Sequence, residues 1–180
     1  SNVHYEVLHG SKAYGVSDET SDNDVYGFCI PPKDIIFPHL AGVINGFDLN
    51  VQKFDQYLQT GVPCPSKATT YDFQIYNIVR YFRLLADNNP NILDSLFVPN
   101  HCVLHITKVG GLVREARHKF LSKRSWPKFK GYSYSQLNKM TTNKREGKRK
   151  ELYDKYGFDI KFALHCVRLL YEAEMILNEC

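Results

Sequence analysis

Two carboxylates one residue apart, Asp22 and Asp24, are the side chains of this sequence best suited to metal chemistry. They stand where an apolar run begins, so on an extended strand both project from the same face. Carboxylate oxygens, together with phosphate oxygens and water, are the ligands that Mg²⁺ prefers. Earlier in the chain, Gly10 allows a close backbone approach, and Ser11 offers an amide and a hydroxyl to phosphate oxygens. Together these residues indicate a site for a metal-bound nucleotide.

Nucleotidyl transfer is the reaction that such a site would serve: a nucleoside monophosphate moves from a nucleoside triphosphate to an acceptor hydroxyl. Two divalent cations bridge the attacking oxygen and the triphosphate, so a third carboxylate is needed from an adjacent strand. Over residues 70–75, apolar side chains alternate with Asp72 and Gln74, and this period-2 pattern turns Asp72 away from the core. Asp72 is therefore the candidate third ligand; an ordinary exposed strand carboxylate is the alternative.

Two predicted strands position these groups. Residues 5–9 alternate and end at Gly10, and residues 24–30 form a second strand that Pro31-Pro32 stops. Strands that flank a Gly-Ser turn are neighbours, which brings the acid pair close to the amides of Gly10 and Ser11. The alternatives are that Asp22 and Asp24 only cap a turn and that Ser11 is an ordinary turn residue.

The middle of the chain predicts further elements around this core. Asn45-Gly46 is a turn signal, so a hairpin is expected there. Asp94 falls within a short predicted helix, where we expect a structural partner or surface residue rather than a catalytic one. The remaining predicted elements are helices over 78–86, 92–97 and 112–121 and a strand over 101–106.

A basic segment follows. Residues 125–131 are expected to form a loop that holds the only Trp, and 134–140 a helix. Lys139–Lys150 contains six basic residues and one acid, so its net charge is +5, whereas that of the whole chain is +4. A local basic segment of this kind fits RNA or another polyanion as partner. A solvated loop or helix face is the alternative. Tyr132 and Tyr134 could stack on bases, although packing is the expected role.

The last predicted helix spans residues 160–177 and follows a capping Asp159. At about 100° per residue, its polar residues fall in a stripe roughly 60° wide. The stripe consists of Lys161, His165, Arg168 and Glu172. One apolar flank consists of Ile160, Leu164, Val167 and Tyr171, the other of Phe162, Leu169, Ala173 and Ile176. We therefore expect a largely buried helix whose stripe faces solvent or an anionic site, with an Arg168–Glu172 ion pair as the structural alternative.

The composition fits one globular domain with a helical appendage. The chain has 180 residues, 43% hydrophobic and 23% charged, enough to bury a core. Five cysteines without a CxxC pair favour reduced thiols in a cytoplasmic protein. No apolar run reaches membrane-spanning length, and no signal peptide is visible. The end at Asn178-Glu179-Cys180 gives the last helix no clear cap, as expected of a chain that continues.

Four blocks of the sequence carry a family resemblance. They are GSKAYGVSDETSDNDVYGF (10–28), NNPNILDSLFVP (88–99), KFLSKRSWPKFKGYSYSQL (119–137) and DIKFALHCVRLL (159–170). In this order they resemble the DNA polymerase beta-like nucleotidyltransferase superfamily, and within it the predicted nucleotidyltransferases of phages and bacteria, some encoded near RNA-repair genes. The family's last block usually reads Lys-His-…-His-…-Arg. Lys161, His165 and Arg168 match it, and Phe162 stands in place of the first His.

The resemblance implies an α+β nucleotidyltransferase fold, with a mixed, mostly antiparallel sheet, flanking helices and a C-terminal helical part. It implies a catalytic core over residues 1–108 and a helical part over 109–180. Two Mg²⁺ or Mn²⁺ ions would be held by Asp22, Asp24 and Asp72. The triphosphate, expected to be that of ATP, would be bound by Gly10, Ser11, Lys12, Lys161, His165 and Arg168.

These observations predict a metal-dependent nucleotidyltransferase in the cytoplasm of a bacterium or phage-infected cell, with RNA or another polynucleotide as acceptor and pyrophosphate as product. Two alternatives stay open. One is a non-catalytic nucleotide- or RNA-binding module with this fold, which would bind through Lys139–Lys150. The other is an enzyme that transfers AMP or another nucleotide to a protein hydroxyl.

Overall fold

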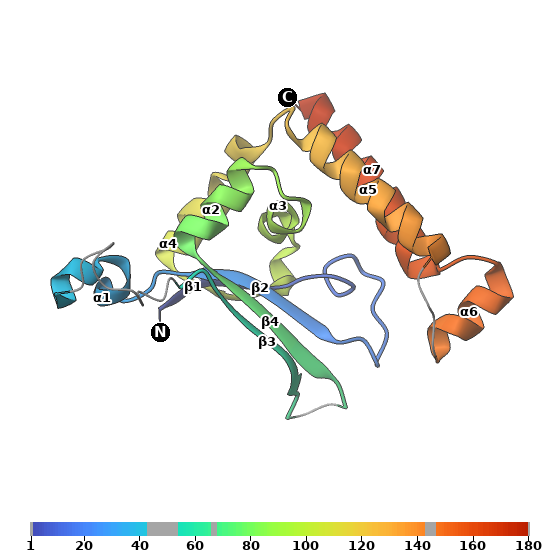
Figure 1. Ribbon diagram of the computed structural model, residues 1–180, viewed down its shortest axis with the longest axis horizontal. Coiled ribbons are helices and arrows are strands. Elements are labelled where there is room, and N and C mark those ends of the chain that lie inside the picture. Colours follow the sequence, from blue (N-terminus) through green and yellow to red (C-terminus); the bar gives the residue numbers. More distant parts are fainter. Residues whose placement is uncertain (1, 43–53, 66–67, 143–146, 180) are drawn as a thin grey trace. The chain divides into compact units, whose positions relative to one another are not determined.

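The computed structural model describes residues 2–42, 54–65, 68–142 and 147–179 (Figure 1). The hairpin turn expected at Asn45-Gly46 lies outside the described residues, as do residues 143–146 of the basic segment.

The internal contacts divide the chain into two compact units. Unit 1 comprises Ser1–Leu85 and Asn91–His118, and unit 2 comprises Ala86–Pro90 and Lys119–Cys180.

Within the described residues, unit 1 is built on a five-stranded mixed sheet with the strand order β3-β4-β2-β1-β5 (Figure 1). The strands are β1 (Val3–Leu8), β2 (Asn23–Cys29), β3 (Gln56–Pro63), β4 (Thr70–Asn77) and β5 (Val103–Ile106). β2 and β4 are parallel, whereas the other neighbouring pairs are antiparallel. The predicted α+β class with a mixed, mostly antiparallel sheet is confirmed.

Helices cover one face of this sheet (Figure 1). The helical segments of unit 1 are α1 (Lys33–Ile36), η1 (Pro38–Ala41), α2 (Ile78–Ala86), α3 (Pro90–Phe97), η2 (Asn100–Cys102) and α4 (Lys108–Glu115). The covering helices are α2, α3 and α4. α4 therefore lies with the sheet in unit 1, although the resemblance placed residues after 108 in the helical part.

A buried aromatic network fixes these helices to the sheet. The Phe28 ring packs 5.9 Å from Tyr5 on β1 and 4.9 Å from Tyr81 on α2. Both tyrosine hydroxyls reach Ser95 on α3: Tyr5 donates to its carbonyl oxygen at 2.8 Å, and Tyr81 bonds its Oγ at 2.7 Å. Arg114 on α4 donates to the Tyr5 hydroxyl at 3.0 Å. Burial raises the pKa of Tyr5, so its phenol stays neutral.

The opposite face of the sheet is apolar. Val25, Cys29 and Ile75 are buried there, and a cavity of about 420 Å³ is lined in part by Cys29, Ile75 and Phe54. Burial raises the pKa of the Cys29 thiol, so the thiol stays protonated and unreactive.

Unit 2 is helical. Its elements are η3 (Arg117–Phe120, which begins in unit 1), α5 (Ser125–Thr142), α6 (Lys148–Tyr156) and α7 (Ile160–Glu179). α5 and α7 run side by side in opposite directions (Figure 1). Phe129 of α5 and Leu169 and Ala173 of α7 are fully buried, and Ser133 Oγ lies 3.1 Å from Cys166 Sγ. The expected C-terminal helical part is thus confirmed.

The prediction of a loop over residues 125–131 was wrong. α5 begins at Ser125 and continues to Thr142. Pro127 and Gly131 suggested a loop, but Pro127 falls in the first turn, where backbone N–H groups have no helical partner to lose. The expected packing of Tyr134 is also wrong, because its side chain is 58% exposed.

The prediction that α7 is buried on both flanks was wrong as well. Leu169, Ala173 and Ile176 are buried. On the other flank, Val167 is 53% and Tyr171 64% exposed, because one neighbouring helix covers only one side of α7 in unit 2.

Among the described helices, none combines the length and the apolar character needed to cross a bilayer.

Candidate active site

The Gly10-Ser11 turn leaves the end of β1 and folds back on itself. The Tyr14 amide donates to the Gly10 carbonyl at 3.1 Å, and the Val16 amide donates to the Ser11 carbonyl at 3.0 Å. Gly10 and Gly15 both have positive φ, +61° and +69°, a conformation that costs an L-residue with a side chain. The turn is therefore compact, with Ser11 half-buried at its start.

Asp24 lies directly against this turn. The His9 amide donates to the Asp24 carbonyl at 2.8 Å, which joins the two strands at that point. A Cβ added to Gly10 would lie 2.3 Å from Asp24 Oδ2, a distance that real Cβ atoms do not show. Only glycine therefore lets the Asp24 carboxylate approach the turn this closely. The structure brings together Gly10 and Asp24, as their spacing predicts.

Asp72 is the register partner of Asp24. β2 and β4 are parallel, with Asp24 opposite Asp72 and Val25 opposite Phe73. Partners in a parallel ladder share a face, and adjacent strands lie about 4.8 Å apart, so these two carboxylates leave the same face of neighbouring strands. The Gly61 amide on β3 donates to Asp72 Oδ1 at 2.8 Å, which holds one of its oxygens.

Asp22 lies one residue before β2 and is exposed. The Thr70 hydroxyl, at the start of β4, donates to Asp22 Oδ1 at 2.9 Å. The three acids therefore stand at the adjoining starts of two parallel strands. A donor from β4 contacts Asp22 and a donor from β3 contacts Asp72, while the Asp24 carboxylate lies close to Gly10.

The donor set suits a hard divalent cation. All three side chains offer carboxylate oxygens, which Mg²⁺ and Mn²⁺ prefer over the nitrogen and sulfur ligands of zinc sites. In the part of the chain that the structure describes, no three His, Cys, Asp or Glu side chains lie close enough together to hold a metal ion, so Asp22, Asp24 and Asp72 stand at neighbouring strand starts without forming one three-carboxylate ligand group. Mg²⁺ at nucleotide sites usually takes one or two carboxylates and completes its shell with phosphate oxygens and water.

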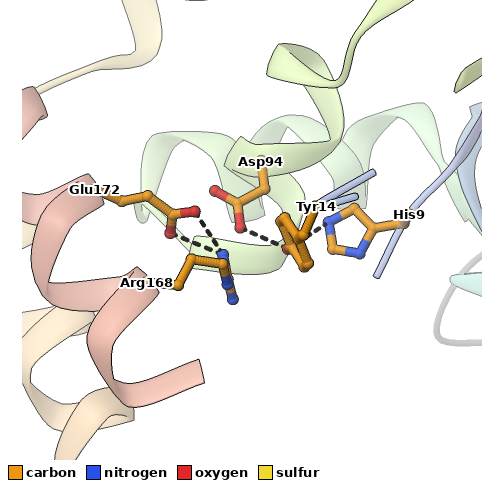
Figure 2. Close-up of polar contacts among 5 residues, drawn as sticks. All are labelled: His9, Tyr14, Asp94, Arg168 and Glu172. Atoms are coloured by element: carbon orange, nitrogen blue, oxygen red, sulfur yellow. Dashed lines mark hydrogen bonds and ion pairs between the residues drawn. The ribbon is translucent and has the colours of Figure 1, made fainter. Parts of the chain in front are cut away.

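A polar network joins the Gly10-Ser11 turn to α3, and most of this network was not predicted from the sequence. The Tyr14 hydroxyl donates to Asp94 Oδ2 at 3.0 Å and lies 3.5 Å from His9 Nε2 (Figure 2). His9 is only 4% exposed and packs 4.4 Å from the Tyr26 ring. Asp94 is thus a structural partner, as expected. The contact between Tyr14 and Asp94 joins residues 80 positions apart, so no local sequence pattern could have indicated it.

Lys12 belongs to the same turn. It is half-buried, and the Cys102 thiol lies 4.0 Å from its carbonyl oxygen as a weak donor. Burial raises the pKa of Cys102, so the thiol keeps the proton that it donates.

Lys161, His165 and Arg168 lie on α7 in unit 2. Asp159 caps this helix, accepting from the Lys161 amide at 3.1 Å. Arg168 Nη1 donates to both carboxylate oxygens of Glu172, at 2.7 and 2.8 Å (Figure 2). The ion pair named as the structural alternative is therefore present, and a role of the three cationic or hydrogen-bonding residues in substrate binding stays a prediction.

The family model of RlaP, the RNA repair pathway DNA polymerase beta family, matches residues 1–179. The chain belongs to this family. Neither a curated protein nor a solved structure matches it. The predicted membership of the polymerase beta-like nucleotidyltransferase superfamily is thereby confirmed, and the five-stranded mixed sheet of the described residues is consistent with that fold.

Proposed function

We propose that this chain is a metal-dependent nucleotidyltransferase, which moves a nucleoside monophosphate from a nucleoside triphosphate to an acceptor hydroxyl. One observation carries the proposal: Asp24 is in parallel register with Asp72 while its carboxylate lies against the backbone of Gly10. The turn proposed to bind phosphates and the two acids proposed to bind metal are adjacent within unit 1.

In the proposed reaction, the acceptor oxygen bonds to the α-phosphorus, and the bond from that phosphorus to the bridging oxygen of pyrophosphate breaks. Asp22, Asp24 and Asp72 would hold Mg²⁺ or Mn²⁺, which neutralises charge on the phosphates. A carboxylate has about four acceptor positions, so the Gly61 contact leaves Asp72 able to take the proton of the acceptor hydroxyl. Pyrophosphate carries away the electron pair.

The Gly10-Ser11 turn would bind the triphosphate. Gly10 lets a phosphate approach the backbone, the Ser11 amide and hydroxyl donate to phosphate oxygens, and Lys12 adds positive charge. Lys161, His165 and Arg168 are proposed to neutralise further charge. ATP is the proposed donor. RNA is the proposed acceptor, since the family is associated with RNA repair.

The test is incubation with each α-labelled nucleoside triphosphate, Mg²⁺ or Mn²⁺, and a mixture of RNA and protein acceptors. We expect label on RNA, stoichiometric pyrophosphate, and loss of both in EDTA. Label on protein would instead support a protein-modifying enzyme. Absence of labelled product and of pyrophosphate with every triphosphate would contradict the proposal and leave a binding module.

Asp34→Asn is the matched control for the acidic residues. Asp34 is an exposed carboxylate on α1, so this variant makes the same chemical change away from the proposed site. Asp22→Asn and Asp24→Asn should abolish transfer and keep the fold, while Asp34→Asn should keep both the transfer activity and the fold.

A further inference from the structure

The stretch that leads into and through α5 concentrates the positive charge of the chain. Residues 117–150 contain twelve Lys and Arg and a single acid, Glu146, a net +11 against +4 for the whole chain. Between Lys119 and Thr142, all of them described, there is no acidic side chain at all. Lys128 is paired with Asp87 at 2.6 Å, and the remaining excess of positive charge favours a polyanion over a neutral protein as partner.

An aromatic–lysine–aromatic row lies on this helix. Trp126, Lys130 and Tyr134 follow each other at i, i+4 and i+8, so they form a line along one side of α5. The Lys130 ammonium lies 5.8 Å from the Trp126 ring centroid and 6.0 Å from that of Tyr134. We call these three residues the α5 ladder.

The ladder is not part of the core of unit 2. α5 buries Phe129, Ser133 and Gln136, which lie on the face of the helix next to the ladder. Trp126 remains 44% and Tyr134 58% exposed. The Lys130 ammonium lies over the faces of both exposed rings, so the row combines two flat apolar surfaces with one cation.

The chemistry of the ladder matches unpaired nucleotides. The rings offer flat apolar faces on which bases stack, and Lys130 between them offers a donor to the phosphates that join those bases. In a duplex the base faces are already stacked and cannot reach a ring. We propose that the α5 ladder binds single-stranded nucleic acid by base stacking. This site goes beyond the proposed transfer reaction, because it needs neither metal nor triphosphate.

Trp126 makes the proposal directly measurable, because it is the only tryptophan of the chain. The full chain is titrated with single strands of about twelve nucleotides, a length within the usual range for such sites, in EDTA and without triphosphate. RNA and DNA are titrated in separate arms, with a duplex as the third arm. We expect stacking to quench the fluorescence with either single strand and not with the duplex. Quenching by RNA alone would narrow the ligand to RNA.

Variants then test the ladder by anisotropy of labelled RNA. Losing one stacked ring should weaken binding roughly 5- to 150-fold, so Trp126→Ala and Tyr134→Ala should each fall in that range. Trp126→Phe should retain most affinity, and Lys130→Gln should lower both affinity and its salt dependence. The matched control is Lys155→Gln, since Lys155 also lies over an exposed ring, Tyr156, at 5.0 Å, but on α6.

Three results would overturn the proposal. One is wild-type affinity in both ring variants with unchanged thermal unfolding. Another is duplex binding equal to that of single strands. The third is absence of nucleic-acid binding together with capture of a protein on the same ring surface. Asp24→Asn should bind single strands as wild type does, so a failure of the transfer proposal and a failure of the ladder are distinguishable.

Discussion

The acidic site of unit 1 and the α5 ladder of unit 2 are built in different ways. Gly10, Asp24 and Asp72 come from three segments and are held by strand register and backbone contacts. The ladder comes from one helix and is held by its periodicity and two cation–π contacts. A site held by backbone should be sensitive to small displacements, whereas exposed side chains can be removed without disturbing the fold. Variants should therefore separate catalysis from nucleic-acid binding.

The largest effect on the rate of transfer is expected from Asp24→Asn, which keeps the shape of the side chain but removes its charge. Loss of a metal-binding carboxylate should lower the rate of transfer by roughly 10³-fold or more. The rate of transfer is measured as pyrophosphate release under saturating triphosphate, and Asp34→Asn is the control. An unchanged transfer rate in Asp24→Asn would show that Asp24 is not part of the active site. Weaker nucleic-acid binding in the same variant would show that the two regions do not act independently.

Gly10→Ala should have the next largest effect. The added Cβ would displace the Asp24 carboxylate, and a shift of about 1 Å at a reacting centre can cost about 10²-fold in rate. Gly15→Ala is the control: Gly15 also has positive φ, but a Cβ there meets nothing within 4 Å. Both variants should lose about 1–2 kcal/mol of unfolding free energy through φ alone.

The comparison of these glycine variants isolates one contact. If Gly15→Ala loses as much transfer activity as Gly10→Ala, then turn strain and not the Asp24 approach sets the rate, and the account of the turn fails.

Tyr14→Phe should have a moderate effect. It removes the hydroxyl that Asp94 accepts, and loss of a positioning partner typically costs about tenfold or more in activity. Because Tyr14 is expected to hold the triphosphate turn, the change should appear as a raised KM for the triphosphate, with about 1 kcal/mol less stability.

Two further variants check this positioning role. Asp94→Asn keeps an acceptor oxygen for the Tyr14 hydroxyl and should do less harm than Tyr14→Phe. Tyr156→Phe, on the exposed part of α6, should change neither KM nor stability. A fall in stability with unchanged KM in Tyr14→Phe would make the contact merely structural.

The smallest effect concerns α7. If Arg168 binds substrate, Arg168→Gln should raise the KM for the triphosphate a few-fold, while Glu172→Gln, which leaves the cation in place, should not. Their ion pair is an i, i+4 contact, so equal losses of unfolding free energy and equal KM in both variants would assign Arg168 to the helix alone.

The strands of unit 1 could be predicted because the sequence of each strand is a local pattern, whereas the role of the acids stays a prediction. Over residues 70–75, alternation assigned Asp72 to one face of its own strand, whereas the face that Asp72 shares with Asp24 follows from the parallel register of β2 and β4. The contact between Tyr14 and Asp94 could not be predicted in this way, since it depends on how α3 packs against the sheet. No local pattern encodes that packing.

The errors on the helical side have a different cause. Pro127 and Gly131 look like helix breakers, but position within the helix decides their cost, and the boundary of α5 depends on that position. The same error concealed the ladder, because Trp126 and Tyr134 lie on one line only if the helix begins before Trp126. On α7, the apolar flank that contains Val167 and Tyr171 was predicted to be buried, but an apolar flank is buried only where a neighbouring element covers it.

The most direct test of the central claim is divalent-ion binding without turnover. Mn²⁺ binding is measured by electron paramagnetic resonance with an unreactive triphosphate analogue, in wild type, Asp24→Asn, Asp72→Asn and Asp34→Asn. We predict that wild type and Asp34→Asn bind the ion alike, and that Asp24→Asn and Asp72→Asn each lose it. Equal binding by all four proteins would contradict a metal-dependent site at the paired starts of β2 and β4.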